Sequence, residues 1–193
     1  MKKILWQDSI IHDNFYDEDT SIRIKEILNI CKANNNFVNK SNVNGFQTKP
    51  LDDKILAKQI LQWSAILIKK EYKVKSNIKL DLELNNFWIN ENYKYSYNKS
   101  HTHPGANLSG VYYLDVPENS GNIFFEDFNK QFTNLHSCFE GEEFQNHMIL
   151  KNNTNQLVIF PSNITHGVEA SMTDKPRISL SFNLVLHYQT KSV

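Results

Sequence analysis

The chain has 193 residues, a formal net charge of zero, 40% hydrophobic residues and 12% aromatic residues. This length and composition predict one globular domain, residues 1–193, with a sizeable core, and they exclude a disordered chain. A neutral chain has no strong basic field that could hold a phosphate backbone, so we expect no stable nucleic-acid binding. Its two cysteines are too few for a disulfide framework or a thiolate metal site.

The N-terminus begins Met-Lys-Lys-Ile-Leu, which is like the start of a signal peptide. Gln7 and Asp8 interrupt the apolar run before it reaches a useful length, so no secretory signal is predicted. No apolar run in the chain is long enough to span a membrane. We therefore expect a cytoplasmic protein that has no membrane partner.

Two stretches near the N-terminus have the periodicity of amphipathic helices. The first covers residues 20–33, with Asp19 or Thr20 as its expected cap, and the second covers residues 51–70. Their apolar residues recur at intervals of three or four: Ile24, Ile27, Leu28 and Cys31, then Leu56, Ile60, Trp63 and Leu67. We expect both helices to cover one face of a sheet and to form a helical support over about residues 1–75.

From residue 79 the hydrophobic period changes to two, because Leu80, Leu82 and Leu84 alternate with acidic residues. Further strand-like segments within a β core of about 79–188 are 87–90, 108–114, 123–125, 157–160 and 177–186. A turn at 117–122 predicts a hairpin that pairs Leu114 with Ile123. The order of helices followed by many short strands predicts an α+β fold with an antiparallel sandwich or barrel, which holds a small ligand at its mouth.

Three histidines and an arginine have the spacing of a mononuclear iron centre with an acidic cosubstrate. His101 and His103 lie two positions apart and point to one side of an extended segment, and His166 follows a later strand. Three such ligands on one face of an octahedron leave three positions for a bidentate acid and for oxygen. Arg177 lies one strand further on, where its planar guanidinium can pair with a carboxylate, and Ser179 on the same side can add a donor.

These motifs resemble the 2-oxoglutarate/iron(II)-dependent oxygenases of marine bacteria and their phages, and more distantly the prolyl hydroxylases. The resemblance covers about residues 80–186 and rests on His-x-His-Pro, Leu-Ser-Gly-Val-Tyr-Tyr-Leu, Gly-Asn-Ile-Phe-Phe-Glu-Asp, Val-Ile-Phe-Pro-Ser-x-x-x-His and Arg-Ile-Ser-x-Ser-Phe-Asn. It implies a double-stranded β-helix, a jelly-roll or cupin-like barrel, with iron(II) and 2-oxoglutarate as cofactors. By position, it implies that His101 and His166 are iron ligands, that Arg177 anchors 2-oxoglutarate and that Tyr113 lies near this cosubstrate.

Position 103 departs from the wider superfamily, which has an aspartate where this chain has His103. Either His103 completes a site of three histidines, which we favour, or Asp127 supplies the carboxylate. In the predicted hairpin Asp127 lies opposite Gly110, within reach of the histidines. A halogenase-like site is disfavoured, because an imidazole would fill the halide position.

The predicted function is a dioxygenase that hydroxylates a small-molecule or peptide substrate and releases succinate and CO₂, with no catalytic residue beyond the metal ligands. One alternative is a non-catalytic, cupin-like barrel that holds zinc or nickel, in which Arg177 has no role. Another is a three-histidine isomerase or dioxygenase that does not use 2-oxoglutarate. The polar segment 129–155, read as a long loop, and the segment Tyr93–Tyr97 are expected to line the substrate.

Overall fold

Antiparallel strands make up most of this computed structural model, which describes residues 9–38, 40–126 and 147–190. In chain order, the elements are β1 (Ile11–Asn14), α1 (Glu18–Ala33), β2 (Asn42–Val43), β3 (Phe46–Gln47), α2 (Lys54–Glu71), β4 (Ile78–Asn92), β5 (Tyr97–His101), β6 (Leu108–Asp115), β7 (Ile123–Glu126), β8 (His147–Leu150), β9 (Gln156–Pro161), β10 (Thr165–Val168) and β11 (Arg177–Thr190). The α+β class predicted from the sequence is confirmed.

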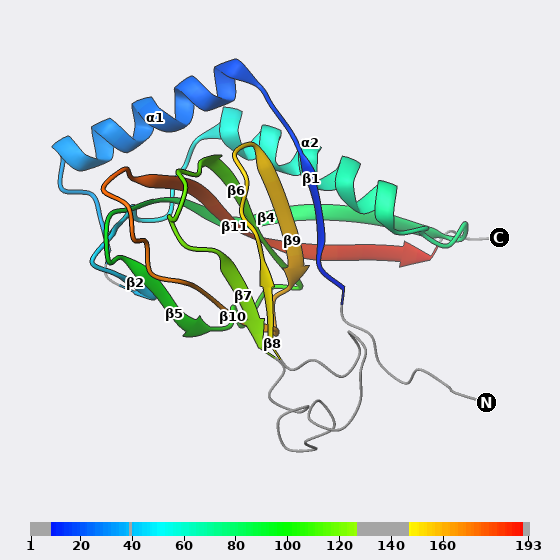
Figure 1. The fold of residues 1–193 in the computed structure, drawn as a ribbon. Coiled ribbons are helices and arrows are strands. Elements are labelled where there is room, and N and C mark those ends of the chain that lie inside the picture. The colour runs from blue at the N-terminus through cyan, green and yellow to red at the C-terminus, as the bar shows by residue number, and fades with distance from the viewer. Residues whose placement is uncertain (1–8, 39, 127–146, 191–193) are drawn as a thin grey trace, which may run out of the picture.

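The strands form two sheets that pack face to face (Figure 1). The six-stranded sheet has the order β1-β9-β6-β11-β4-β3, and the five-stranded sheet has the order β2-β5-β10-β7-β8. Apolar side chains from both sheets meet between them: Val111, Tyr113, Ile123, Phe125, Val158 and Phe160. The strands β4 to β7 alternate between the two layers, and so do β8 to β11, around one interior, which is the predicted double-stranded β-helix.

The predicted hairpin between Leu114 and Ile123 is wrong. The strand β6 pairs with β9 and β11 in the large sheet, whereas β7 pairs with β8 and β10 in the small sheet. The turn at 117–122 therefore carries the chain from one sheet to the other. As a result, Gly110 lies opposite Phe182 and Ile159 rather than opposite Asp127, and Asp127 itself lies outside the described residues.

The prediction that residues 129–155 form one long loop is also only partly correct. Residues 147–150 form β8, which pairs with β7, and residues 127–146 lie outside the described part of the chain. The strand β8 has exposed apolar residues at Met148 and Ile149 rather than an alternating pattern, so its sequence did not indicate a strand.

Both helices pack on the outer face of the large sheet, as predicted (Figure 1). The first begins two residues earlier than the sequence suggested, because Asp17 rather than Asp19 or Thr20 is its cap and accepts a hydrogen bond from the backbone N–H of Thr20. The second is capped in the same way by Asp53. Arg23 donates two hydrogen bonds to the Asp53 carboxylate, which fixes the two helices to each other.

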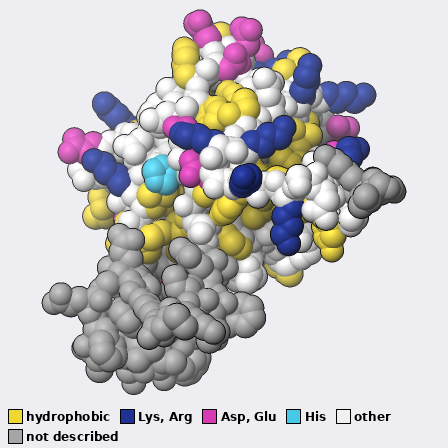
Figure 2. Space-filling view, turned by 90° about the vertical axis from the view of Figure 1, so that its right-hand side faces the viewer, with side chains coloured by type: hydrophobic (Ala, Val, Ile, Leu, Met, Phe, Trp, Pro, Cys, Tyr) yellow, Lys and Arg dark blue, Asp and Glu magenta, His cyan; other side chains and the backbone are white. Residues whose placement is uncertain are grey.

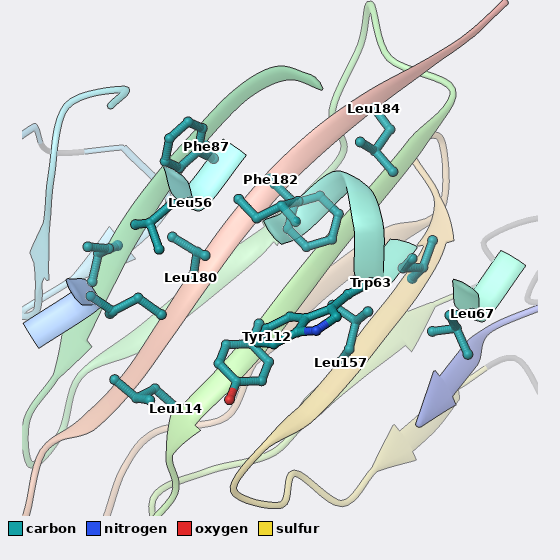
Figure 3. Close-up of a cluster of buried hydrophobic side chains, with 14 of the residues drawn as sticks. Leu56, Trp63, Leu67, Phe87, Tyr112, Leu114, Leu157, Leu180, Phe182 and Leu184 are labelled. Carbon is teal, nitrogen blue, oxygen red and sulfur yellow. The ribbon is translucent and has the colours of Figure 1, made fainter. Parts of the chain in front are cut away.

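The main hydrophobic core lies between these helices and the large sheet (Figure 3). Trp63 of α2 stacks at a tilt on Tyr112 of β6, with a distance of 4.8 Å between ring centroids, and Leu180 and Phe182 of β11 are buried nearby. Removing a buried aromatic side chain of this kind typically costs about 3–5 kcal/mol of unfolding free energy. One face of the large sheet therefore packs against the helices, and its opposite face lines the interior between the two sheets.

A β-bulge at Asn85 changes which residues of β4 point into that interior. Asn183 of β11 pairs with Asn86, but its neighbour Leu184 pairs with Leu84, so Asn85 is the extra residue. Leu84 consequently packs toward the helices, while Asn86 lies on the interior face. The bulge thereby brings polar residues of β4 toward the mouth of the barrel.

The outer ends of β4 and β11 extend past the rest of the large sheet, on the right in Figure 1. Figure 2 faces this end of the molecule and shows hydrophobic side chains exposed among lysine and arginine side chains. An apolar groove of about 530 Å³ lies between α2 and β4, with Leu61, Ile68 and Leu80 in its wall. Neither helix that the structure describes is long and apolar enough to cross a membrane.

Candidate metal and cosubstrate site

Three histidines predicted as metal ligands meet between the two sheets. His166 of β10 pairs directly with His101 of β5, and His103 follows two residues after His101. One ring nitrogen of each residue lies within 4.8 Å of those of the other two. The ring centroids are 4.4 Å apart for His101 and His166, 4.8 Å for His101 and His103, and 5.0 Å for His103 and His166. Such spacing allows one ion to contact all three imidazoles.

Backbone carbonyls orient two of these rings. The Nδ1 atom of His101 lies 2.7 Å from the carbonyl oxygen of Lys99, and Nδ1 of His166 lies 3.0 Å from that of Ile164. Because a carbonyl oxygen only accepts, Nδ1 is the donor in both rings and Nε2 keeps its lone pair. This is the tautomer that a metal ligand needs, with the second ring nitrogen held as in many metal sites.

His103 is positioned differently, through its backbone and an aromatic neighbour. Its backbone N–H donates to the carbonyl of Ser162 at 2.9 Å, and its ring lies 5.8 Å from the ring of Trp88 between centroids. The Ser162 hydroxyl in turn contacts the Ser109 hydroxyl, which donates to Asn183 on β11. The segment that carries His103 is therefore fixed to the large sheet.

Burial keeps all three imidazoles uncharged. It lowers the pKa of His166 to about 3 and the pKa of His103 to about 4, and it also lowers the pKa of His101. The positive charge of Lys40 acts in the same direction on His103, and protonation of one ring would disfavour protonation of its neighbours. Near neutral pH the cluster therefore presents three neutral nitrogen donors, which suits iron, zinc or nickel.

Arg177 lies at the start of β11 and is almost completely buried, with 1% of its surface exposed. One guanidinium nitrogen donates to the backbone carbonyls of Ser120 and Gly121, while Nε has no hydrogen-bond partner. No carboxylate among the described residues pairs with this guanidinium. A buried cation without a counter-ion is costly, so the site fits an anion such as the far carboxylate of 2-oxoglutarate.

Two further predicted residues lie beside Arg177. Ser179 is two positions along the same strand, on the same face, and pairs with Tyr113 of β6 across the sheet. Burial raises the pKa of Tyr113 to about 12, while the charge of Arg177 and a hydrogen bond with Asn152 act in the opposite direction. Tyr113 therefore stays protonated and can donate a hydrogen bond near Arg177.

Other residues expected at the site do not lie there. Tyr93, Tyr95 and Tyr97 are exposed and do not line the cavity beside the histidines. Instead, the Tyr93 hydroxyl contacts Glu91 and Lys32 on the helix side of β4.

The polar interior face of the large sheet was not predicted from the sequence. Trp88 and Asn86 of β4, together with Asn183 of β11, line a cavity next to His101 and His103. The alternation Arg-Ile-Ser-Leu-Ser-Phe-Asn along β11 carried a usable signal. A strand in the middle of a sheet that is covered on both faces, yet polar at every second position, indicates a polar interior.

Solved structures confirm the fold at low sequence identity. A prolyl-4-hydroxylase from Pseudomonas putida matches with a TM-score of 0.60 and 12% identity, over 91% of this chain and 92% of that chain. A prolyl hydroxylase from Trichoplax adhaerens, in complex with a peptide fragment of the hypoxia-inducible factor oxygen degradation domain, matches with a TM-score of 0.57 and 14% identity, over 91% and 83%.

HygX from Streptomyces hygroscopicus, solved with nickel, 2-oxoglutarate and hygromycin B, matches with a TM-score of 0.57 and 11% identity, over 92% of this chain and 83% of that chain. No curated protein matches the chain by sequence.

A family model described as "Putative 2OG-Fe(II) oxygenase" matches residues 86–183, which is more than half of the chain. The matched range contains the three clustered histidines and Arg177. The cofactors predicted from the sequence, iron(II) and 2-oxoglutarate, are those of this family. The chain belongs to the 2OG-Fe(II) oxygenase family and is an enzyme that depends on iron(II) and 2-oxoglutarate.

Proposed function

We propose that the chain is a 2-oxoglutarate-dependent dioxygenase that hydroxylates its substrate and in which His101, His103 and His166 hold the iron. The cluster of three neutral imidazoles supports this assignment, because each ring has a nitrogen within 4.8 Å of those of the others. When bound, iron(II) and 2-oxoglutarate supply the oxidising chemistry and yield succinate and CO₂. The chain itself holds, orients and shields these partners.

The observation that carries the proposal is the buried, unpaired Arg177. Its guanidinium would bind the far carboxylate of 2-oxoglutarate, with Tyr113 and Ser179 as neighbouring donors. Charge balance supports the same assignment, since three neutral histidines leave both charges of iron(II) uncompensated. The carboxylate of 2-oxoglutarate nearer the iron would offset one of these charges, and the distal carboxylate would neutralise Arg177.

Apolar side chains between the sheets would exclude water from this region. Phe125 and Phe160 contact His166, with ring centroid distances of 6.3 Å and 4.5 Å, and Val158 is fully buried nearby. A dry surrounding strengthens the pairing of Arg177 with a carboxylate. A purely structural metal barrel gives no role to a buried arginine of this kind, so it is disfavoured.

The substrate is proposed to be a small molecule or a peptide. This range is consistent with the Trichoplax adhaerens prolyl hydroxylase, solved with a peptide fragment, and with HygX, solved with hygromycin B. A cytoplasmic location and a single domain over residues 1–193 remain proposals from the sequence.

The test is conversion of labelled 2-oxoglutarate to succinate and CO₂ in the presence of iron(II) and oxygen, across peptide, amino-acid and nucleotide substrates. We expect turnover by the wild type, loss in His166→Ala and a raised KM for 2-oxoglutarate in Arg177→Gln. Arg23→Gln is the matched control, since Arg23 pairs with Asp53 on the helices. Absence of iron-dependent succinate from the wild type, or equal KM values in Arg177→Gln and Arg23→Gln, would contradict the proposal.

A further inference from the structure

A cavity of about 470 Å³ opens beside the histidine cluster. His101 and His103 form part of its wall, and Trp88, Asn86 and Asn183 contribute from the large sheet. A molecule in this cavity would therefore lie against a metal held by the histidines.

The cavity lies mainly on the side of the cluster away from Arg177, although its wall reaches Gln47, which pairs with Asn90 at the level of Ser179. Trp88, whose ring contacts His103, pairs with Ser181 of β11, which marks the level of the cluster along that strand. Along β11, Arg177 lies four residues before Ser181, or about 13 Å away. Asn183 lies two residues after Ser181, or about 7 Å away. None of Arg177, Ser179 and Tyr113 lines the cavity, so it adjoins the region that Arg177 would provide for 2-oxoglutarate without including it.

Lysine side chains give this cavity a positive field. Lys40 and Lys99 both line it, no aspartate or glutamate does, and no carboxylate among the described residues forms an ion pair with either lysine. Glu126 lies next to the wall, where it accepts a hydrogen bond from Ser100 at 2.9 Å, and offsets part of this charge. Two cations against one neighbouring carboxylate leave the cavity net positive.

Side-chain amides add directional hydrogen-bonding groups. Asn86 accepts a hydrogen bond from Asn183 at 2.8 Å, and no described residue accepts one from the Asn86 side-chain nitrogen, which can donate to a ligand oxygen. The Asn86 amide therefore adds a directional donor beside the two lysines.

We infer that this cavity binds the substrate through a carboxylate or phosphate group held near Lys40 and Lys99, with the Asn86 amide as a further donor. The inference rests on the proposed function, because the cavity is assigned to the substrate by its contact with the metal-binding histidines. The substrate class is therefore a small anion or an acidic group of a larger molecule, and not a neutral apolar compound.

The test measures binding of matched probe pairs by calorimetry, to protein loaded with iron(II) and saturated with 2-oxoglutarate in the absence of oxygen. Glutamate against glutamine is the carboxylate arm, and adenosine monophosphate against adenosine is the phosphate arm. In at least one arm the anion should bind about tenfold more tightly than its neutral partner, and the difference should shrink as salt is added. The arm that shows the preference identifies the anionic group.

Lysine variants then locate the binding. Lys40→Gln and Lys99→Gln should each raise the Kd of the anion about threefold to fivefold and leave the Kd of the neutral partner unchanged. Lys58 lies on α2 and does not line the cavity, so the matched control Lys58→Gln should change neither of these Kd values. If no anion is preferred in either arm, or if Lys58→Gln has the same effect as the cavity variants, the inference is wrong.

Failure of this inference can be distinguished from failure of the proposed function. The affinity for 2-oxoglutarate should fall in Arg177→Gln and stay unchanged in the lysine variants. If Arg177→Gln weakens 2-oxoglutarate binding, but the Kd of the anionic probes is unchanged in Lys40→Gln and Lys99→Gln, only the substrate inference fails. If the affinity for 2-oxoglutarate is the same in the wild type and in Arg177→Gln, the proposed function fails.

Discussion

At the level of single residues, the histidines of the site were easier to predict than their surroundings. His101 and His103 share one side of an extended segment because of the two-residue period, and His166 adjoins them through strand pairing. Trp88 carries no such local signal, since its contact with His103 depends on the pairing of distant strands. The choice between His103 and Asp127 remains a prediction, which a metal-binding experiment decides.

Replacing any one of His101, His103 and His166 by alanine should remove iron from the protein, because two imidazoles alone rarely retain iron(II). Iron content after gel filtration is the measurement. His187→Ala is the matched control, since His187 contacts Glu83 at the exposed end of β11 and should leave iron bound. Retention of iron in His103→Ala, combined with its loss in Asp127→Asn, would show that the carboxylate is the third ligand.

The metal-free site should also resist protonation. Free histidine has a pKa near 6.5, but burial lowers the pKa of His103 to about 4 and that of His166 to about 3. Since metals bind the neutral imidazole, affinity for iron(II) should change little between pH 7.5 and 5.5 and fall only toward pH 4. Anaerobic titrations at several pH values measure this. A loss of roughly tenfold per histidine by pH 5.5 would show ordinary imidazoles instead.

The same shifts affect the stability of the metal-free fold. Unfolded histidines bind protons below pH 6.5, whereas folded His103 and His166 stay neutral until about pH 4 and 3. The free energy of unfolding should therefore be fully retained above pH 6.5 and decrease as the pH falls below it. The metal titrations require a folded protein, so circular dichroism at each pH is their control.

At the level of the elements, hydrophobic periodicity predicted both helices and most strands of the large sheet. The bulge in β4 was readable in principle, because Leu80, Leu82 and Leu84 occupy even positions while Phe87 and Ile89 occupy odd positions. A change of phase within one strand indicates an extra residue. The partner strands were not readable, since a turn at 117–122 suits a hairpin and a sheet-to-sheet crossing equally well.

The close approach of β6 and β11 provides an element-scale prediction. A Cβ atom at Gly110 would lie 2.2 Å from the ring of Phe182, on the strand directly opposite. Gly110→Ala should therefore displace this buried ring and lower the free energy of unfolding by about 1–3 kcal/mol, measured by chemical denaturation.

Combining this change with Phe182→Leu tests the cause. The smaller side chain makes room, so the cost of Gly110→Ala should be lower in the Phe182→Leu background than in the wild type. An equal cost in both backgrounds would show that the ring contact is not the reason for the glycine.

At the level of the whole molecule, the barrel divides the site into two regions. Arg177 lies at one end of the interior row of β11, Asn183 lies toward the other, and the histidine cluster lies between them. This division follows from sheet order, which joins strands far apart in the chain and has no signature in local sequence. The double-stranded β-helix was therefore predicted from the resemblance to known motifs and not from hydrophobic periodicity.

The central claim is that the three histidines and Arg177 act together as one iron and 2-oxoglutarate site. Calorimetric titration of 2-oxoglutarate into the protein without oxygen, with and without iron(II), tests it most directly. We predict tight binding only with iron(II), a loss of about 2–5 kcal/mol of binding free energy in Arg177→Gln, and no change in Arg23→Gln. Binding of 2-oxoglutarate that is equally tight without iron(II), or that is unaffected in Arg177→Gln, would contradict the account.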